Sequence, residues 1–203
     1  MRKQKIILLI TLLSAMLVGC GDNTGRETQS DNTKNSNEIV STEQNNNSNK
    51  NESKDLTIEE LEAQLSNQPI VINRTEYVVQ DEQLKALYPD GLRVVLQNNS
   101  NIDIKNLKVG FVAWDSNNLP VKISAQFDYS GGSYFKEVFC YDANMVPGGT
   151  YGENHFFNID ENNNIATFKA IVISYEGFEG ETWENPLLDE FRKIYENKKL
   201  KTQ

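Results

Sequence analysis

The stretch GLRVVLQNNSNIDIKNLKVGFVAWDSNNLPV, residues 91–121, decides the fold of this 203-residue chain. Its middle part, residues 104–115, is strand-like, and apolar side chains recur there at every second position: Leu107, Val109, Phe111 and Ala113. This period of two places them on one face of a strand. Asn-rich turns lie on both sides, at residues 98–101 and 115–118, because Asn tolerates left-handed dihedrals and bonds to its own backbone.

Further strand-like runs lie on either side of this centre. They occupy residues 70–80, 91–100, 119–129, 133–142, 150–159 and 166–178. Pro147-Gly148-Gly149 and Asn162-Asn163-Asn164 supply turn chemistry between the later runs. Short strands separated in this way are typical of an antiparallel sandwich or barrel, so we expect a mainly β fold.

Helices are predicted at both ends of the strand region. Thr57 and Glu60 form a capping box that begins a short helix, which Pro69 ends. Near the C-terminus an amphipathic helix is predicted, with Asn185 as its cap and Pro186 at its first position. We expect this second helix either to pack on the strands or to serve as a partner-binding element. The first helix is expected to belong either to the core or to the polar segment that precedes it.

The N-terminus has the features of a bacterial lipoprotein signal. Three cations, Arg2, Lys3 and Lys5, precede an apolar run that is shorter than the roughly 20 residues a membrane span needs. Leu17-Val18-Gly19-Cys20 resembles the lipobox, which implies a signal peptide at 1–19 and a diacylglyceryl group on the sulfur of Cys20. The alternative is a chance cysteine after a conventional signal.

A polar segment, residues 20–56, follows the signal. It is rich in Asn, Ser, Thr and charge, and it has too few apolar residues to offset the entropy of ordering. We therefore predict a disordered tether of about 36 residues with an r.m.s. span on the order of 30–35 Å. The folded domain is predicted at residues 57–203, and the protein is expected on the extracellular face of the cell membrane of a Gram-positive cell.

The charge of the chain limits the classes of partner. Removing the three cations of the signal from a chain of net charge −9 leaves a mature protein of net charge −12. Nucleic acid is excluded as a partner, because neutralising phosphates takes clusters of Lys and Arg. The expected partners are the membrane, through the lipid on Cys20, and a protein or cell-wall ligand.

Residues 98–121 resemble the hallmark of FxLYD-type immunoglobulin-like domains. Phe111, Trp114 and Asp115 occupy the Phe, Tyr and Asp positions of that pattern, and Ala113 stands where Leu is usual. Pro147-Gly148-Gly149-Thr150 resembles the turn that follows in such domains. The resemblance covers about residues 91–175 and implies an immunoglobulin-like β-sandwich in a small Firmicutes lipoprotein of unassigned function, without a catalytic residue.

Few residues indicate chemistry. Cys140 and the single His155 are the one pair that suggests a cysteine hydrolase, yet Cys140 sits in an alternating strand as a small hydrophobe. The run from Asp160 to Asn164 begins like a calcium loop but lacks the Gly and the final Glu, which favours an Asn-rich turn. We expect no catalytic residue, no metal site and no cofactor.

Aromatic residues next to Asp and Asn are the candidate binding residues: Trp114, Trp183 and Tyr134, together with Tyr129. The alternative is that Trp114 and Trp183 seal the two ends of the core. The leading interpretation is a membrane-anchored extracellular lipoprotein that acts as a non-catalytic binding or accessory module. There are two alternatives: a regulator or sensor subunit of a membrane complex, and an envelope hydrolase using paired carboxylates.

Overall fold

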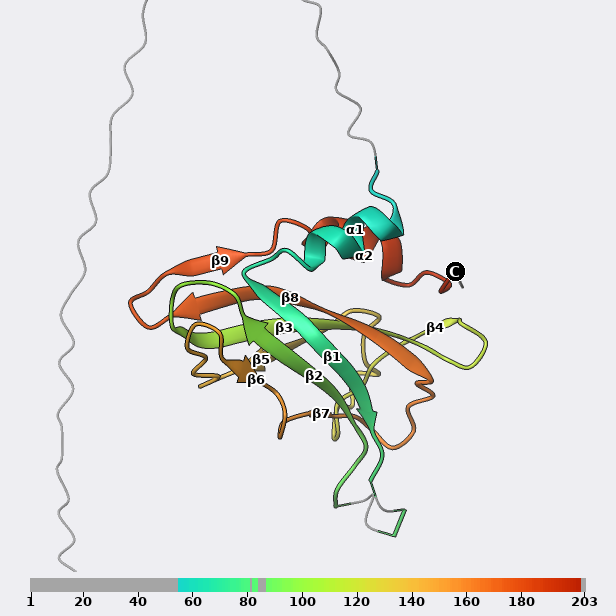
Figure 1. Cartoon of the computed structure of the whole chain (residues 1–203). Coiled ribbons are helices and arrows are strands. Elements are labelled where there is room, and N and C mark those ends of the chain that lie inside the picture. Colours follow the sequence, from blue (N-terminus) through green and yellow to red (C-terminus); the bar gives the residue numbers. More distant parts are fainter. Residues whose placement is uncertain (1–54, 81, 84–86, 202–203) are drawn as a thin grey trace, which may run out of the picture. The chain divides into compact units, whose positions relative to one another are not determined.

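The computed structural model describes residues 55–80, 82–83 and 87–201 of the chain (Figure 1). The predicted signal peptide, Cys20 and the predicted tether up to residue 54 lie outside the described residues. The fold is mainly β. Its elements are α1 (Ile58–Leu65), β1 (Ile70–Val78), β2 (Gly91–Asn98), β3 (Ile104–Trp114), β4 (Pro120–Val121), β5 (Lys136–Cys140), β6 (Thr150–Tyr151), β7 (Phe157–Asn158), β8 (Thr167–Gly177), β9 (Thr182–Glu184) and α2 (Leu188–Tyr195).

The strands form two antiparallel sheets. The first, here called the β2 sheet, has the order β1-β2-β6, and β7 also pairs with β2. The second, called the β3 sheet, has the order β4-β3-β8-β9, and β5 pairs with β3. The longest ladder joins β3 to β8, from Ile104 opposite Gly177 to Trp114 opposite Thr167, with two register shifts.

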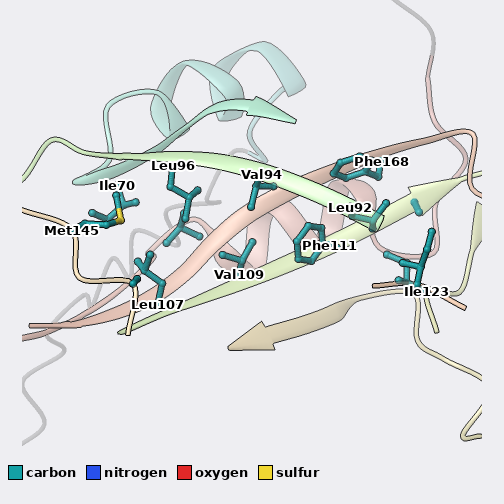
Figure 2. Close-up of a cluster of buried hydrophobic side chains, with 14 of the residues drawn as sticks. Ile70, Leu92, Val94, Leu96, Leu107, Val109, Phe111, Ile123, Met145 and Phe168 are labelled. Atoms are coloured by element: carbon teal, nitrogen blue, oxygen red, sulfur yellow. The ribbon is translucent and has the colours of Figure 1, made fainter. Parts of the chain in front are cut away.

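The two sheets face each other across a hydrophobic core, which confirms the mainly β prediction (Figure 2). The core contains Leu92, Val94 and Leu96 from β2, and Leu107, Val109, Phe111 and Ala113 from β3. The four β3 residues are the ones that the period of two placed on a single face. Burial of these apolar side chains removes them from water, which is the main force that holds the sheets together.

A second core lies on the other face of the β3 sheet, where α1 and α2 pack. Val112, Trp114 and Ile171 from the strands meet Leu61, Phe191 and Tyr195 from the helices. Trp114 therefore lies on the face opposite Phe111, as an odd spacing requires. The predicted capping box begins α1: the Thr57 hydroxyl accepts from the Glu60 N–H at 3.2 Å, and Glu60 Oε2 accepts from the Thr57 N–H at 2.8 Å.

The Asn-rich turn after β2 is built around one buried side chain. Asn98 is fully buried, and its amide donates to the carbonyls of Ile102 and Met145 at 2.8 and 3.1 Å. Its side-chain oxygen accepts from the N–H of Ser100 at 2.9 Å. The turn chemistry predicted for residues 98–101 is confirmed, and the same residue also ties the β2–β3 turn to the segment before β6.

Two strand predictions were wrong in extent. Residues 150–159 form two short strands, β6 and β7, because the chain turns at Gly152, whose φ is +102°. His155 therefore lies in a turn, where its N–H bonds to the Gly152 carbonyl. Residues 119–129 keep only β4 and two isolated bridges, at Ile123 and Ala125.

The C-terminal helix also begins later than predicted. It runs from Leu188, while Asn185 is buried before it and bonds to the carbonyl of Val172 and the N–H of Leu187. Asn185 thus fixes the entry into α2 on the β3 sheet without being its cap. Both helices pack on that sheet. No helix among the described residues is long and apolar enough to cross a membrane.

Candidate functional site

A cleft of about 460 Å³ opens between β5 of the β3 sheet and β6 and β7 of the β2 sheet. We call it the aromatic cleft. Its floor reaches the core between the sheets, because Leu92, Val94 and Phe111 line the cleft and are also part of that core. The other residues that line it are Ala125, Gln126, Val138, Phe139, Cys140, Tyr151, Gly152, His155, Phe156, Phe157 and Asn158.

Strand β5 forms one wall of the aromatic cleft. Val138 and Cys140 pack against the core between the sheets, so they point into the cleft side of the strand. Phe139 and Tyr141 alternate with them and are 58% and 69% exposed. Their rings stack at a centroid distance of 5.7 Å, and the Lys108 ammonium lies 5.0 Å from the Phe139 centroid. One short strand thus carries apolar side chains on both faces.

A strained loop follows the end of the cleft. Ala125 and Gln126 line the cleft, and the next residue, Phe127, has a φ of +64°, which is rare and costly for a bulky side chain. Phe127 is 70% exposed and Tyr129 is 93% exposed. The loop holds two large aromatic rings in solvent next to an apolar cleft.

Asp128 fixes this loop between the two exposed rings. Its carboxylate accepts from Lys136 Nζ at 2.8 Å and from the N–H and hydroxyl of Ser130 at 3.0 and 2.5 Å. The bond from Lys136 and those from Ser130 hold the pKa of Asp128 well below its ordinary range. Because Lys136 begins β5, the ion pair connects the loop to the wall of the cleft.

Cys140, Tyr151 and His155 come together inside the aromatic cleft. A hydrogen bond joins the Cys140 thiol to the Tyr151 hydroxyl, and the His155 ring stacks on the Tyr151 ring at 5.0 Å. Burial raises the pKa of the Cys140 thiol, and the bond to Tyr151 offsets part of that rise. Burial likewise raises the pKa of the Tyr151 phenol. The thiol is therefore held protonated, whereas a nucleophilic cysteine needs its thiolate stabilised.

The lining of the aromatic cleft is mainly apolar and aromatic, and its polar side chains are Gln126, Tyr151, His155 and Asn158. None of the described residues that line it is Asp, Glu, Lys or Arg. Within the described part of the chain, no group of three or more His, Cys, Asp or Glu residues is placed to hold a metal ion. The cleft can therefore take an uncharged, apolar group and bury it against aromatic rings.

A larger groove of about 700 Å³ lies beside β1, β8 and the helices, and it is the weaker candidate. The one carboxylate among its described lining residues, Glu62, is bonded to Lys169 Nζ and the Tyr195 hydroxyl, both at 2.7 Å. Burial and the hydrogen bond to Glu62 raise the pKa of Tyr195. Glu62 thus links α1, β8 and α2, which is a structural role. Among the described lining residues, neither the aromatic cleft nor this groove brings two carboxylates together.

The predicted binding residues lie on different elements of the fold. Trp114 is 1% exposed, and its Nε1 donates to the Lys198 carbonyl at 2.7 Å beneath α2. Trp183 is half-buried in β9 and stacks on Tyr175 at 5.4 Å. Tyr134 is half-buried before β5, with Lys122 Nζ 5.8 Å from its ring centroid. Trp114 is thus almost fully buried under the helices, and it is also one of the residues that line the larger groove.

The residues of the aromatic cleft were not identified from the sequence as a group. A signal existed in YFKEVFCYD, residues 134–142, where the aromatic residues Phe139 and Tyr141 alternate with the apolar Val138 and Cys140. A strand that is apolar on both faces has to be covered on both sides or form an interaction surface. The opposite wall, from β6 and β7, is brought there only by pairing with β2.

Comparisons with known proteins concern the fold and the family. A hypothetical protein from Peptoclostridium difficile 630, known from a 1.85 Å X-ray structure, is similar, with a TM-score of 0.52 and 14% identity. The similarity covers 66% of this chain and 94% of that chain, and it bears on the fold alone. No curated protein matches the chain.

The model of a family described as "Family of unknown function (DUF5780)" matches residues 91–198. This region begins at β2 and ends just after α2, so it includes most of both sheets, α2 and all the described residues that line the aromatic cleft. Because the match spans more than half of its residues, the chain belongs to this family of unknown function, DUF5780.

Proposed function

We propose that this protein is a membrane-anchored extracellular lipoprotein whose folded domain is a non-catalytic binding module at the cell envelope. The observation that carries the binding role is the aromatic cleft, which opens from the surface into the core between the sheets. Apolar surface left open in this way is costly unless a partner covers it, and such concave sites are where proteins bind ligands.

Three features favour binding over catalysis. The Cys140 thiol is held protonated by burial, and its hydrogen-bond partner is a phenol and not an imidazole. The lining of the aromatic cleft has no carboxylate among its described residues, and the larger groove has only Glu62. A hydrolase with paired carboxylates needs two of them facing one bond, so the alternative of an envelope hydrolase gains no support.

The anchor in this proposal is the diacylglyceryl group on Cys20. Two acyl chains are needed for stable attachment, since each buried methylene contributes about 0.8 kcal/mol. Metabolic labelling with a radioactive fatty acid tests it: the chain should take up label and remain with the membrane fraction. A Cys20→Ala variant should lose the label and leave the membrane fraction, and retention of both would contradict the anchor.

The immunoglobulin-like assignment and the FxLYD resemblance are part of the same proposal. Two facing antiparallel sheets, Phe111 in the core between them and Trp114 on the opposite face agree with it. A crystal structure tests the assignment through its strand connections. An order of strands that differs from the Greek-key arrangement of immunoglobulin-like sandwiches would count against it.

Site-directed photo-crosslinking in cells tests the binding role. A photoreactive residue at position 139 stands at the aromatic cleft, and the same residue at Glu179, on the exposed turn between β8 and β9, is the control. We expect one dominant adduct from position 139 and none from position 179. A membrane protein captured in fixed ratio would identify a regulatory subunit, and wall fragments would identify a wall-binding protein. Equal yields from both positions would contradict the assignment of the cleft as the binding site.

A further inference from the structure

We infer that the ligand of the aromatic cleft is an extended polypeptide segment, which adds to the open edge of β5 as a further strand and inserts uncharged apolar side chains into the cleft. This inference rests on the proposed binding function and names the chemical class of the ligand. Three observations support it: the unpaired edge of β5, the pattern of side chains along that edge, and the mainly apolar lining of the cleft.

Strand β5 has one unpaired edge. Within the described part of the chain, its residues Lys136–Cys140 pair with β3 alone, from Phe111 opposite Lys136 to Leu107 opposite Cys140. Backbone donors and acceptors on the other edge are therefore open to a second chain. A peptide that adds a strand to such an edge gains its affinity from main-chain hydrogen bonds and its specificity from pockets for alternate side chains.

Charged side chains lie in the middle of the edge strand β1, whereas the second half of β5 has none. β1 also pairs with one neighbour, β2, but its middle residues, 73–76, are exposed and read Asn-Arg-Thr-Glu. Polar and charged side chains of this kind prevent unwanted pairing at a sheet edge. β5 begins with the charged Lys136 and Glu137, which pair with Asp128 and Lys108. Its second half is Val138-Phe139-Cys140, followed by the exposed Tyr141. The contrast indicates that the second half of β5 can accept an added strand from another chain.

The side chains along β5 define what an added strand has to present. A strand placed next to β5 continues the same two faces, because side chains alternate along each strand of a sheet. One set of its side chains would enter the aromatic cleft beside Val138 and Cys140. The other set would lie beside the stacked rings of Phe139 and Tyr141. Large apolar side chains suit both positions.

The mainly apolar lining of the cleft favours a polypeptide over a glycan. A sugar brings hydroxyl groups that need partners, and burying them unpaired costs free energy. Inside the cleft the Tyr151 hydroxyl is already joined to the Cys140 thiol. The other polar side chains among the described lining residues are Gln126, His155 and Asn158, so a glycan would find few partners there. An extended peptide meets its backbone partners on β5 and leaves only apolar side chains for the cleft.

In the first experiment, random linear peptides displayed on phage are selected for binding to the mature chain. The target comprises residues 20–203 with the Cys20→Ser substitution. Cys140 is then the single cysteine and acts as a built-in reporter, since the chain has two in all. Enriched peptides should alternate large apolar residues, and should slow alkylation of Cys140 by at least about tenfold. Absence of any enriched peptide that protects Cys140 would overturn the inference.

Methylation of the peptide backbone then tests strand addition itself. In an added strand, every second residue directs its N–H toward β5 and the others direct theirs away. N-methyl groups on the first set should weaken binding by at least about tenfold, because each of them removes a main-chain hydrogen bond to β5. N-methyl groups on the second set should leave binding intact. Equal effects of the two sets would overturn strand addition while leaving the cleft as a binding site.

A matched pair of variants places the peptide on the protein. Phe139 and Phe178 are 58% and 57% exposed, but only Phe139 lies on β5, in the wall of the cleft. Phe139→Lys should weaken peptide binding by at least about tenfold and Phe178→Lys should not, with unchanged circular dichroism for both. Equal binding by both variants would overturn the assignment of the peptide to β5.

Solubilised wall fragments, used as a second probe, separate the inference from the proposed function. Protection of Cys140 by these fragments without protection by any peptide would show that the ligand class is wrong while the cleft remains a binding site. Protection by neither probe would contradict the aromatic cleft as a binding site altogether, and with it the inference. Protection by peptides alone is the expected result.

Discussion

The two regions that adjoin the β3 sheet differ in what covers them. On the helix side, Val112, Trp114 and Ile171 lie beneath α1 and α2, and Trp114 is 1% exposed. Around β5, Phe139 is 58% exposed and its strand has an open edge beside the aromatic cleft. Both regions are rich in apolar side chains. What distinguishes a core from an interaction surface here is whether another element of the same chain packs on it.

The difference teaches that the domain covers the strand residues around Val112 and Trp114 with its own helices and leaves the region around β5 open. On the helix side, polar groups are joined to each other: Glu62 bonds to Lys169 and Tyr195, and Asn185 bonds to the Val172 carbonyl. Around β5, the Lys136–Asp128 ion pair instead fixes a loop that holds exposed aromatic rings. The helix side is expected to contribute stability, and the open side is expected to contribute binding.

The strongest test of this comparison truncates one aromatic residue on each side. Phe191 is 1% exposed and its ring lies 5.0 Å from that of Tyr195, so Phe191→Ala should cost about 3–5 kcal/mol in the free energy of unfolding. Phe139→Ala should change it by less than about 0.5 kcal/mol, because its ring is largely exposed. Urea unfolding followed by fluorescence measures both, and equal losses would break the comparison.

A smaller effect is expected at the polar group that positions α2. Asn185→Ala should cost about 1–3 kcal/mol, because it leaves the buried Val172 carbonyl and Leu187 N–H without their side-chain partner. The control is Asn162→Ala in an exposed turn, which should change stability by no more than about 0.5 kcal/mol. Urea midpoints of the two variants and the parent chain give the comparison. A neutral Asn185→Ala would show that α2 does not depend on this contact.

Alkylation of Cys140 sharpens the description of the open side. Burial raises the pKa of the thiol, so its thiolate fraction at neutral pH is below that of a free cysteine. The folded chain with Cys20→Ser should react with iodoacetamide at least about tenfold more slowly than the same chain in urea, equivalent to about 1.4 kcal/mol. The rate should rise with pH up to values above the ordinary thiol pKa. A rate equal to that of the unfolded chain would mean that the cleft leaves Cys140 fully exposed.

The smallest expected effect concerns Asp128 in the exposed loop. Its pKa lies below the ordinary value of 3.8 in the folded chain, so its carboxylate stabilises the fold above that pH. This contribution is lost as the pH falls through the lowered pKa, because protonation removes the charge that pairs with Lys136. Asp128→Asn should therefore lower the Tm slightly at neutral pH and make no difference in strong acid. Glu179→Gln is the control, and a loss that persists in acid would contradict the ion pair as its cause.

The sequence predicted the strand framework where local pattern and long-range pairing agree. The period of two in residues 104–115, the capping box at Thr57 and the Asn98 turn were all confirmed. It failed where a strand-like composition lacks a partner along its whole length. Residues 119–129 and 150–159 were predicted as full strands but keep only β4, β6 and β7, since strand formation depends on which neighbours are within reach.

The candidate site shows the same limit. Aromatic residues could be identified from the sequence, but their exposure could not: Trp114 became part of a core, whereas Phe139 and Tyr141 stayed in solvent. Cys140 and His155 were noted as a pair, and they do line one cleft, with Tyr151 in contact with both. The role of Tyr151 had no local signal, because β6 reaches the cleft only by pairing with β2.

By itself, the sequence determined the local features: which residues are apolar at every second position, where Asn turns the chain, and which Thr and Glu begin α1. Those features depend on neighbours within a few residues, and so they can be read from the order of side chains. Only the tertiary structure decided that α1 and α2 cover one face of the β3 sheet and that the edge of β5 is left open. An apolar pattern requires that a face be covered, but what covers it depends on contacts between segments far apart in the chain.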